Sequence, residues 1–81
     1  MINIDYNTLA ITWVEWNEVP SITELMDEMD RNGIDWDYDN WNSYLQHHYN
    51  LNINIRFGVN NEWGLQFNNI EEMDLFIINF L

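Results

Sequence analysis

Residues 51–67 read LNINIRFGVNNEWGLQF, and this stretch decides the fold. Apolar and polar side chains alternate in its first half; the apolar ones are Leu51, Ile53, Ile55, Phe57 and Val59. Trp63, Leu65 and Phe67 alternate in the same way in its second half. Asn60-Asn61 lies between the halves, and asparagine tolerates the positive φ of a tight turn. A period of two is typical of a half-buried strand, so the stretch predicts a β-hairpin with one apolar face.

Two further strands are expected near the N-terminus. Residues 2–6 alternate apolar and polar side chains, and residues 9–16 are rich in β-branched and aromatic side chains. They predict a second hairpin that turns near Asn7-Thr8. Trp13 and Trp16 fall on opposite faces of the second strand, so one of them is expected to be exposed.

A helix is expected to begin at Ser21. Ser21 and Glu24 have the spacing of a capping box, and Pro20 precedes them. The helix carries an apolar stripe at helical spacing, formed by Ile22, Leu25, Met26 and Met29. Gly33 is the expected C-terminal stop, and the acids of this segment are expected to face solvent.

Residues 34–39 read IDWDYD and alternate strictly, which predicts either a short edge strand or an extended loop. As a strand, it would place three aspartates in a row, spaced about 6.6–6.8 Å apart. Asp39 or Asn40 is expected to cap a second helix that ends near Tyr49. One face of that helix carries Trp41, Tyr44, Leu45 and His48.

A last helix is expected after Asn68 or Asn69, its cap. Glu71 and Glu72 occupy the first turn, where the helix dipole favours acids. Its expected buried stripe is Ile70, Met73, Phe76, Ile77 and Phe80. Together, these strand and helix patterns predict one α+β domain over residues 1–81. In it, an antiparallel sheet of about four strands carries about three helices on one face.

Composition excludes several classes of function. The chain has fourteen acids, two arginines, no lysine and no cysteine, and its net charge is −12 at pH 7. It therefore lacks the cations needed to bind nucleic acid or anionic membranes directly, and it has no disulfide or thiolate zinc site. Acidic disordered chains are poor in apolar residues, but this chain is 47% hydrophobic, so we expect a folded domain.

Catalytic, metal-binding and cofactor-binding patterns are weak. Ser21 is explained as a cap, Ser43 lacks the glycines of a nucleophile elbow, and His47 and His48 project about 100° apart on a helix. We expect no enzyme and no cofactor. Asp35-x-Asp37-x-Asp39 resembles the start of an EF-hand loop, but later positions carry Asn40 and Gln46 in place of glycine and glutamate. No metal ligand is assigned; a divalent-cation-binding module stays an alternative.

The acids are concentrated in residues 15–39, which carry a net charge of −8. Trp36 and Trp41 flank the aspartates of this segment, and aromatic anchors surrounded by acids are typical of interface hot spots. Asparagine supplies most of the remaining polar side chains, so the surface stays negative. We expect a partner-binding surface formed by Glu24, Asp27, Glu28, Asp30, Asp35, Trp36, Asp37, Tyr38 and Asp39.

In size, charge and lack of lysine, the chain resembles small acidic phage-encoded DNA mimics of the anti-CRISPR and anti-restriction type. The resemblance lies in composition and implies an inhibitor that occupies the basic DNA- or RNA-binding groove of a host defence nuclease. Neutralising Asp35, Asp37 and Asp39 together is expected to weaken such inhibition without unfolding the domain. An immunity or antitoxin protein that caps a basic toxin nuclease is the alternative.

The expected partner is therefore a basic nucleic-acid-binding protein, with no direct contact to nucleic acid or membrane. A homodimer through the hairpin or the C-terminal helix is a further option. No signal peptide is expected at Met1–Asp5, and the apolar residues 75–81 are too few to span a bilayer. We expect a cytoplasmic location in an infected or producing bacterium.

Overall fold

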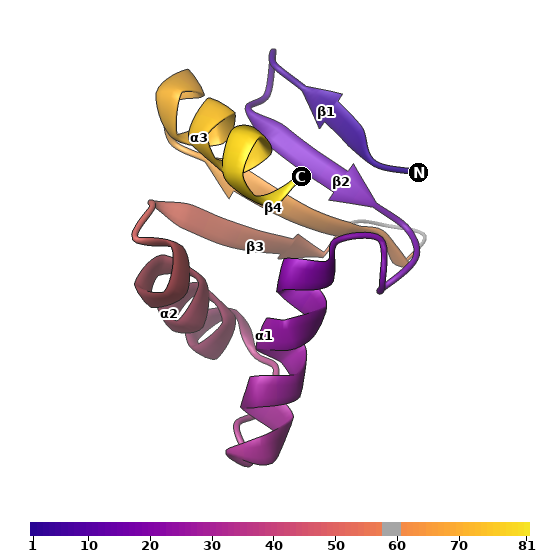
Figure 1. The fold of residues 1–81 in the computed structure, drawn as a ribbon, viewed down its shortest axis with the longest axis vertical. Coiled ribbons are helices and arrows are strands. Elements are labelled where there is room, and N and C mark those ends of the chain that lie inside the picture. The colour runs from indigo at the N-terminus through magenta and orange to yellow at the C-terminus, as the bar shows by residue number, and fades with distance from the viewer. Residues whose placement is uncertain (58–60) are drawn as a thin grey trace.

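The computed structural model describes residues 1–57 and 61–81, and it confirms the predicted α+β fold class (Figure 1). The elements are β1 (Asn3–Asp5), β2 (Ala10–Trp13), α1 (Pro20–Arg31), α2 (Tyr38–Tyr49), β3 (Ile53–Phe57), β4 (Trp63–Phe67) and α3 (Ile70–Phe80). Gly58, Val59 and Asn60 of the predicted hairpin lie outside the described residues. Asn61 has a φ of +61°, the left-handed conformation that asparagine tolerates in turns.

The described strands form one antiparallel sheet in the order β1-β2-β4-β3. Both predicted hairpins are present, and β2 joins them by pairing with β4. Leu65 lies opposite Ile11 on one side and Ile55 on the other. Because directly paired residues point to the same face, the apolar residues of all four strands share one side of the sheet.

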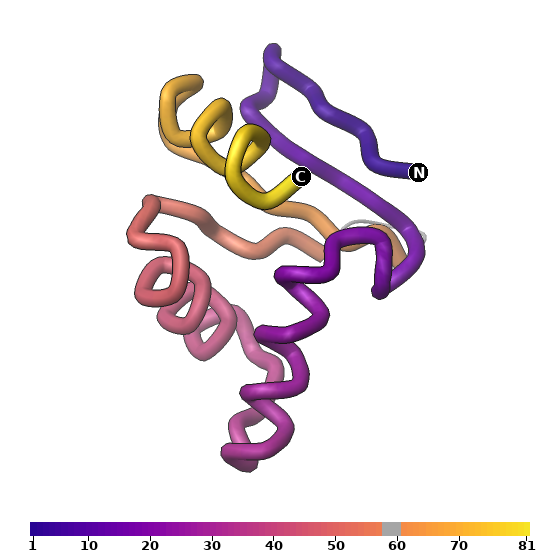
Figure 2. Tube along the Cα trace, viewed as in Figure 1, coloured from indigo at the N-terminus to yellow at the C-terminus, as the bar shows by residue number. Residues whose placement is uncertain are grey.

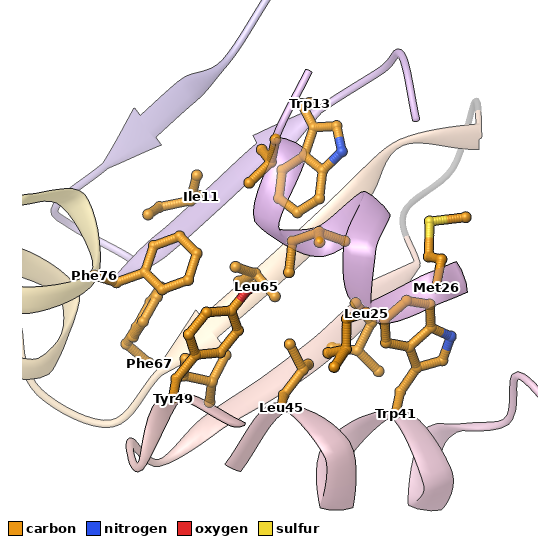
Figure 3. Packing of buried hydrophobic residues seen from close by; sticks show 14 of the residues in the cluster. Ile11, Trp13, Leu25, Met26, Trp41, Leu45, Tyr49, Leu65, Phe67 and Phe76 are labelled. Carbon is orange, nitrogen blue, oxygen red and sulfur yellow. The ribbon is translucent and has the colours of Figure 1, made fainter. Parts of the chain in front are cut away.

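The helices cover this apolar face, as predicted. All three contribute to one buried core with the sheet, and Figure 3 shows Leu25, Leu45 and Phe76 converging on it from α1, α2 and α3. Trp13 and Trp41 are its largest fully buried side chains. Burying one of the aliphatic or phenylalanine side chains of this core contributes roughly 1.5–3 kcal/mol. Within the described residues, no helix has the length and apolar character needed to cross a bilayer.

The opposite face of the sheet carries small and polar residues. Gly64 lies between Thr12 and Arg56 in neighbouring strands. A Cβ atom at Gly64 would lie 3.3 Å from both Arg56 Cβ and Thr12 Cγ2, closer than side chains normally approach. Arg56 donates a hydrogen bond to Gln66 Oε1 at 2.9 Å on this face.

The second strand is shorter than predicted, because the chain leaves the sheet after Trp13. The Glu18 carboxylate accepts hydrogen bonds from the backbone N–H groups of Val14 (3.1 Å) and Glu15 (3.0 Å) and so holds a turn there. Trp13 is buried, whereas Trp16 is 52% exposed. The expectation that one of the two tryptophans is exposed is therefore confirmed.

The start of α1 differs from the prediction. Its N-cap is Val19, without a side-chain hydrogen bond, so the predicted capping box of Ser21 and Glu24 is wrong. Pro20 fixes the first helical residue, and the Ser21 hydroxyl instead pairs with the hydroxyl of Tyr49. The C-terminal stop is confirmed, since Gly33 has a φ of +67°.

Residues 34–37 form a loop that leads directly into α2, so the loop alternative is confirmed there, whereas the edge strand and its regular row of aspartates are wrong. Helix α2 begins at Tyr38, and its N-cap is Asp37 instead of Asp39 or Asn40. Asp39 is therefore helical, while Asp35 lies in the preceding loop. Tyr49 is buried at the C-terminal end of α2, and His48, predicted on the apolar face, is exposed.

Helix α3 follows the prediction closely. Asn69 caps it by accepting a hydrogen bond from Glu72 N–H at 2.9 Å, with Glu71 and Glu72 in the first turn. Met73 and Phe76 are fully buried. Ile70 departs from the predicted stripe, because the first helical residue lies at the rim of the core and is exposed.

Candidate partner-binding surface

Five aromatic side chains from three parts of the chain form a continuous series at one end of the sheet. Tyr38 contacts Phe57 at a centroid distance of 5.3 Å, and Phe57 contacts Trp63 at 5.5 Å. Trp63 contacts Trp41, and Trp41 contacts Trp36, each at 6.2 Å. The hairpin β3–β4 and the start of α2 therefore support one another through aromatic edges and faces.

The outer members of this series are exposed. Trp36 is 42% exposed, Tyr38 52% and Phe57 40%, whereas Trp41 is fully buried. We call Trp36, Tyr38 and Phe57 the aromatic patch. Trp36 contacts buried Trp41, and Tyr38 and Phe57 connect to the same ring through half-buried Trp63, so the patch presents apolar area that is anchored to the core. Rigid aromatic side chains of this kind are typical anchors in protein interfaces.

Three acids lie between the end of α1 and the first turn of α2, in the same short segment as Trp36 and Tyr38 of the aromatic patch. Asp35, Asp37 and Asp39 are all exposed and alternate along the chain with Trp36 and Tyr38. Asp37 Oδ1 accepts a hydrogen bond from the backbone N–H of Asn40 at 2.8 Å. The Asn40 side-chain amide donates to the Asp35 carbonyl at 3.0 Å, so local hydrogen bonds hold this loop.

The predicted acids of α1 form a second group. Glu24 and Asp27 are exposed on the side of the helix opposite its buried stripe, and Glu28 is half-buried beside them. Asp30 is exposed nearer the edge of that stripe, since residues on a helix are separated by about 100°. Figure 2 shows the C-terminal end of α1 projecting from the rest of the molecule before the chain returns to α2.

Where the structure describes the chain, the acids of both groups form no ion pair with a cationic side chain. Among residues 1–57 and 61–81, the only ion pair joins the Met1 ammonium to Glu18. The net charge of −12 is spread over a body of 35 × 28 × 20 Å. Duplex DNA carries roughly 18 charges over 30 Å, so the protein reaches about two-thirds of that density.

A hollow that the sequence did not predict lies beside the aromatic patch. It has a volume of about 210 Å³ and is lined by Phe57, Asn61, Glu62 and Trp63. The alternation predicted that Phe57 and Trp63 lie on the apolar face of the sheet, and this is confirmed. The partial exposure of the two side chains follows only from the packing of the helices. The one sequence signal for the hollow was the acid directly before Trp63.

Two other hollows lie away from this surface. Gln46, Asn50, Leu51, Asn52 and Glu72 line one of about 310 Å³, in which Glu72 accepts a hydrogen bond from Asn52 N–H at 2.6 Å. Ser43, Tyr44 and His47 line an apolar one of about 250 Å³. In the part of the chain that the structure describes, no three histidine or acidic side chains converge as metal ligands.

The predicted site residues thus all lie at or near the surface. They form two groups, one on α1 and one on the α1–α2 loop and the start of α2. Trp36 and Tyr38 belong to the second group. The structure adds Phe57, Glu62 and Trp63 to that group. Comparison with protein-family models, with curated proteins and with solved structures gave no match for this chain.

Proposed function

We propose that this chain is a protein-binding inhibitor that mimics nucleic acid and occupies the basic groove of a defence nuclease in a bacterial cytoplasm. The observation that carries the proposal is the set of exposed, unneutralised acids around the aromatic patch. A groove lined with arginine and lysine attracts such a surface over long range and binds it rapidly. Inhibition then follows by exclusion of the nucleic acid, and no chemical step is needed.

The two parts of the surface have different roles in this proposal. Exposed acids provide attraction and orientation, but each surface ion pair contributes only about 0–1 kcal/mol. The aromatic patch supplies apolar area that a nuclease groove can cover, and such anchors dominate the affinity of many interfaces. Trp36 and Tyr38 are therefore the proposed anchors, and the acids at positions 35, 37 and 39 are their charged surroundings.

One observation favours the second candidate, an immunity or antitoxin protein that caps a toxin nuclease. Asp35, Asp37 and Asp39 do not repeat at a regular spacing, since Asp37 caps a helix of which Asp39 is part. A surface that imitates duplex DNA is expected to space its carboxylates regularly, as phosphates are spaced along the duplex. A surface made for one dedicated toxin has no such requirement, and its charges need only match that toxin.

The test is capture from host lysate with the tagged protein, followed by nuclease assays with each captured basic enzyme. The proposal expects a nucleic-acid enzyme that is released by high salt or by competing DNA and is inhibited in DNA or RNA cleavage. Inhibition of several unrelated nucleases favours the mimic, and inhibition of a single toxin favours the immunity protein. Neutral partners that resist salt, or the absence of inhibition, would contradict both.

A further inference from the structure

We propose that the hollow lined by Phe57, Glu62 and Trp63 receives one arginine side chain of the basic partner. This inference rests on the proposed function, because it specifies how the partner contacts the surface. The hollow differs from the rest of the acidic surface in combining aromatic walls with a carboxylate, while Asn61 adds an amide.

The walls of the hollow favour a cation. The rings of Phe57 and Trp63 meet at an interplanar angle of 66°, with centroids 5.5 Å apart, so they form two sides of a corner. Aromatic faces attract cations through their quadrupole, and tryptophan does so most strongly. Each ring has a further aromatic contact, Phe57 with Tyr38 and Trp63 with buried Trp41. The corner therefore exists before a partner arrives.

The carboxylate selects the kind of cation. Glu62 is half-buried, and among the described residues no ion pair or side-chain hydrogen bond engages it. A guanidinium is planar, stacks on aromatic rings and donates two parallel hydrogen bonds to a carboxylate, whereas an ammonium is a compact, strongly hydrated point charge. Phe57, Trp63 and Glu62 together therefore fit arginine better than lysine.

The hollow also explains why an acid stands apart from the main acidic segment. Residues 40–61 contain no acid, and Glu62 follows this stretch directly before Trp63. A charge at this place adds little to a field dominated by residues 15–39. It does place one acid among the residues that line the hollow, together with the two aromatic residues.

The probe for this site is a short capped peptide, acetyl-Gly-Arg-Gly-amide, titrated into isotope-labelled protein and followed by NMR. The Trp63 indole signal is identified by its loss in Trp63→Phe. We expect the peptide to shift this signal and the Glu62 backbone signal in a saturable manner. Matched peptides carry lysine, which is expected to bind more weakly, or citrulline, which has the shape of arginine without its charge and is expected to cause no saturable shift.

Three variants separate the hollow from general charge attraction. Glu62→Gln and Phe57→Leu are each expected to weaken peptide binding about two- to fivefold. Glu71→Gln removes one charge at the start of α3 and is expected to leave binding unchanged. Equal binding of arginine and citrulline peptides, or equal effects of Glu62→Gln and Glu71→Gln, would overturn the assignment.

The failure of this inference can be distinguished from that of the proposed function. Peptide binding at the hollow, combined with no inhibited nuclease, keeps the arginine site and overturns the inhibitor. A nuclease that is inhibited equally by the wild type, Glu62→Gln and Phe57→Leu keeps the inhibitor and overturns the arginine site. Both experiments use the full chain.

Discussion

Oδ1 of Asp37 accepts a hydrogen bond from the backbone N–H of Asn40 at 2.8 Å, and this bond fixes where α2 begins. In the helix that begins there, Trp41 is buried and Tyr38 is exposed. One residue of the acidic surface is thus a structural cap as well as a charge. One substitution of Asp37 can remove the charge and keep the cap, whereas another removes both.

Asp37→Ala is expected to destabilise the protein by about 1 kcal/mol, because an N-cap side chain is lost. Asp37→Asn is expected to keep nearly all of the stability, since asparagine caps equally well. The free energy of unfolding in urea measures both. Equal destabilisation by the two substitutions would contradict the capping role.

The aromatic series predicts a clear division between stability and binding. Trp41→Ala empties a fully buried site and is expected to cost about 3–5 kcal/mol, a large part of the stability of so small a domain. Trp36→Ala removes a 42% exposed ring and is expected to cost about 1 kcal/mol or less. Its main expected effect is weaker partner binding. Urea unfolding and a binding titration on the same samples test this division.

Self-repulsion predicts that stability increases with salt. The charges on the described surface are mostly unpaired, and the screening length falls from about 30 Å at 0.01 M to about 3 Å at 1 M salt. The melting temperature is therefore expected to be higher in 1 M than in 0.01 M sodium chloride. A variant that combines Glu24→Gln, Asp27→Asn and Asp35→Asn is expected to gain less from salt. An equal gain would mean that repulsion between these acids is not the cause.

Asp5 gives a prediction with a defined direction in pH. Its carboxylate accepts hydrogen bonds from Asn7 N–H at 2.9 Å and Thr8 N–H at 3.3 Å, and these lower its pKa, the Asn7 bond most. An acid with a lowered pKa stabilises the fold above its ordinary pKa of about 4, and this stabilisation is lost as the pH falls through the folded-state value.

The wild type is therefore expected to be more stable than Asp5→Asn at pH 7. This difference is expected to shrink towards zero as the pH is lowered below about 4. Comparing the two proteins at each pH cancels the relief of repulsion that protonation of the other acids brings. A difference that stays constant from pH 7 to the lowest pH tested would contradict the role of the Asp5 charge.

The sheet and the helices could be predicted because burial imposes their periods on the sequence. Ile53, Ile55, Leu65 and Phe67 alternate because one face of the hairpin is covered. The cap of α2 was harder to predict, since Asp37, Asp39 and Asn40 are all suitable caps and local sequence does not choose among them. The choice follows from tertiary packing, which must bring Trp41, Leu45 and Tyr49 onto the core together.

The candidate site was predicted only in part. Its acids and two of its aromatic residues could be named from composition and spacing, because charge and size belong to the residues themselves. Phe57, Glu62 and Trp63 could not, because the alternation marks which face they share and says nothing of how far the helices extend over it.

In the proposed function, the acids beside the aromatic patch bind a basic partner through their position, beyond their contribution to net charge. The most direct measurement compares the dissociation constants of two double variants for the captured nuclease. Asp35→Asn with Asp39→Asn removes two charges beside the aromatic patch. Glu71→Gln with Asp74→Asn removes the same number of charges on α3. We expect at least about tenfold weaker binding for the first pair, corresponding to about 1.4 kcal/mol, and little change for the second. Equal weakening by both pairs would contradict it.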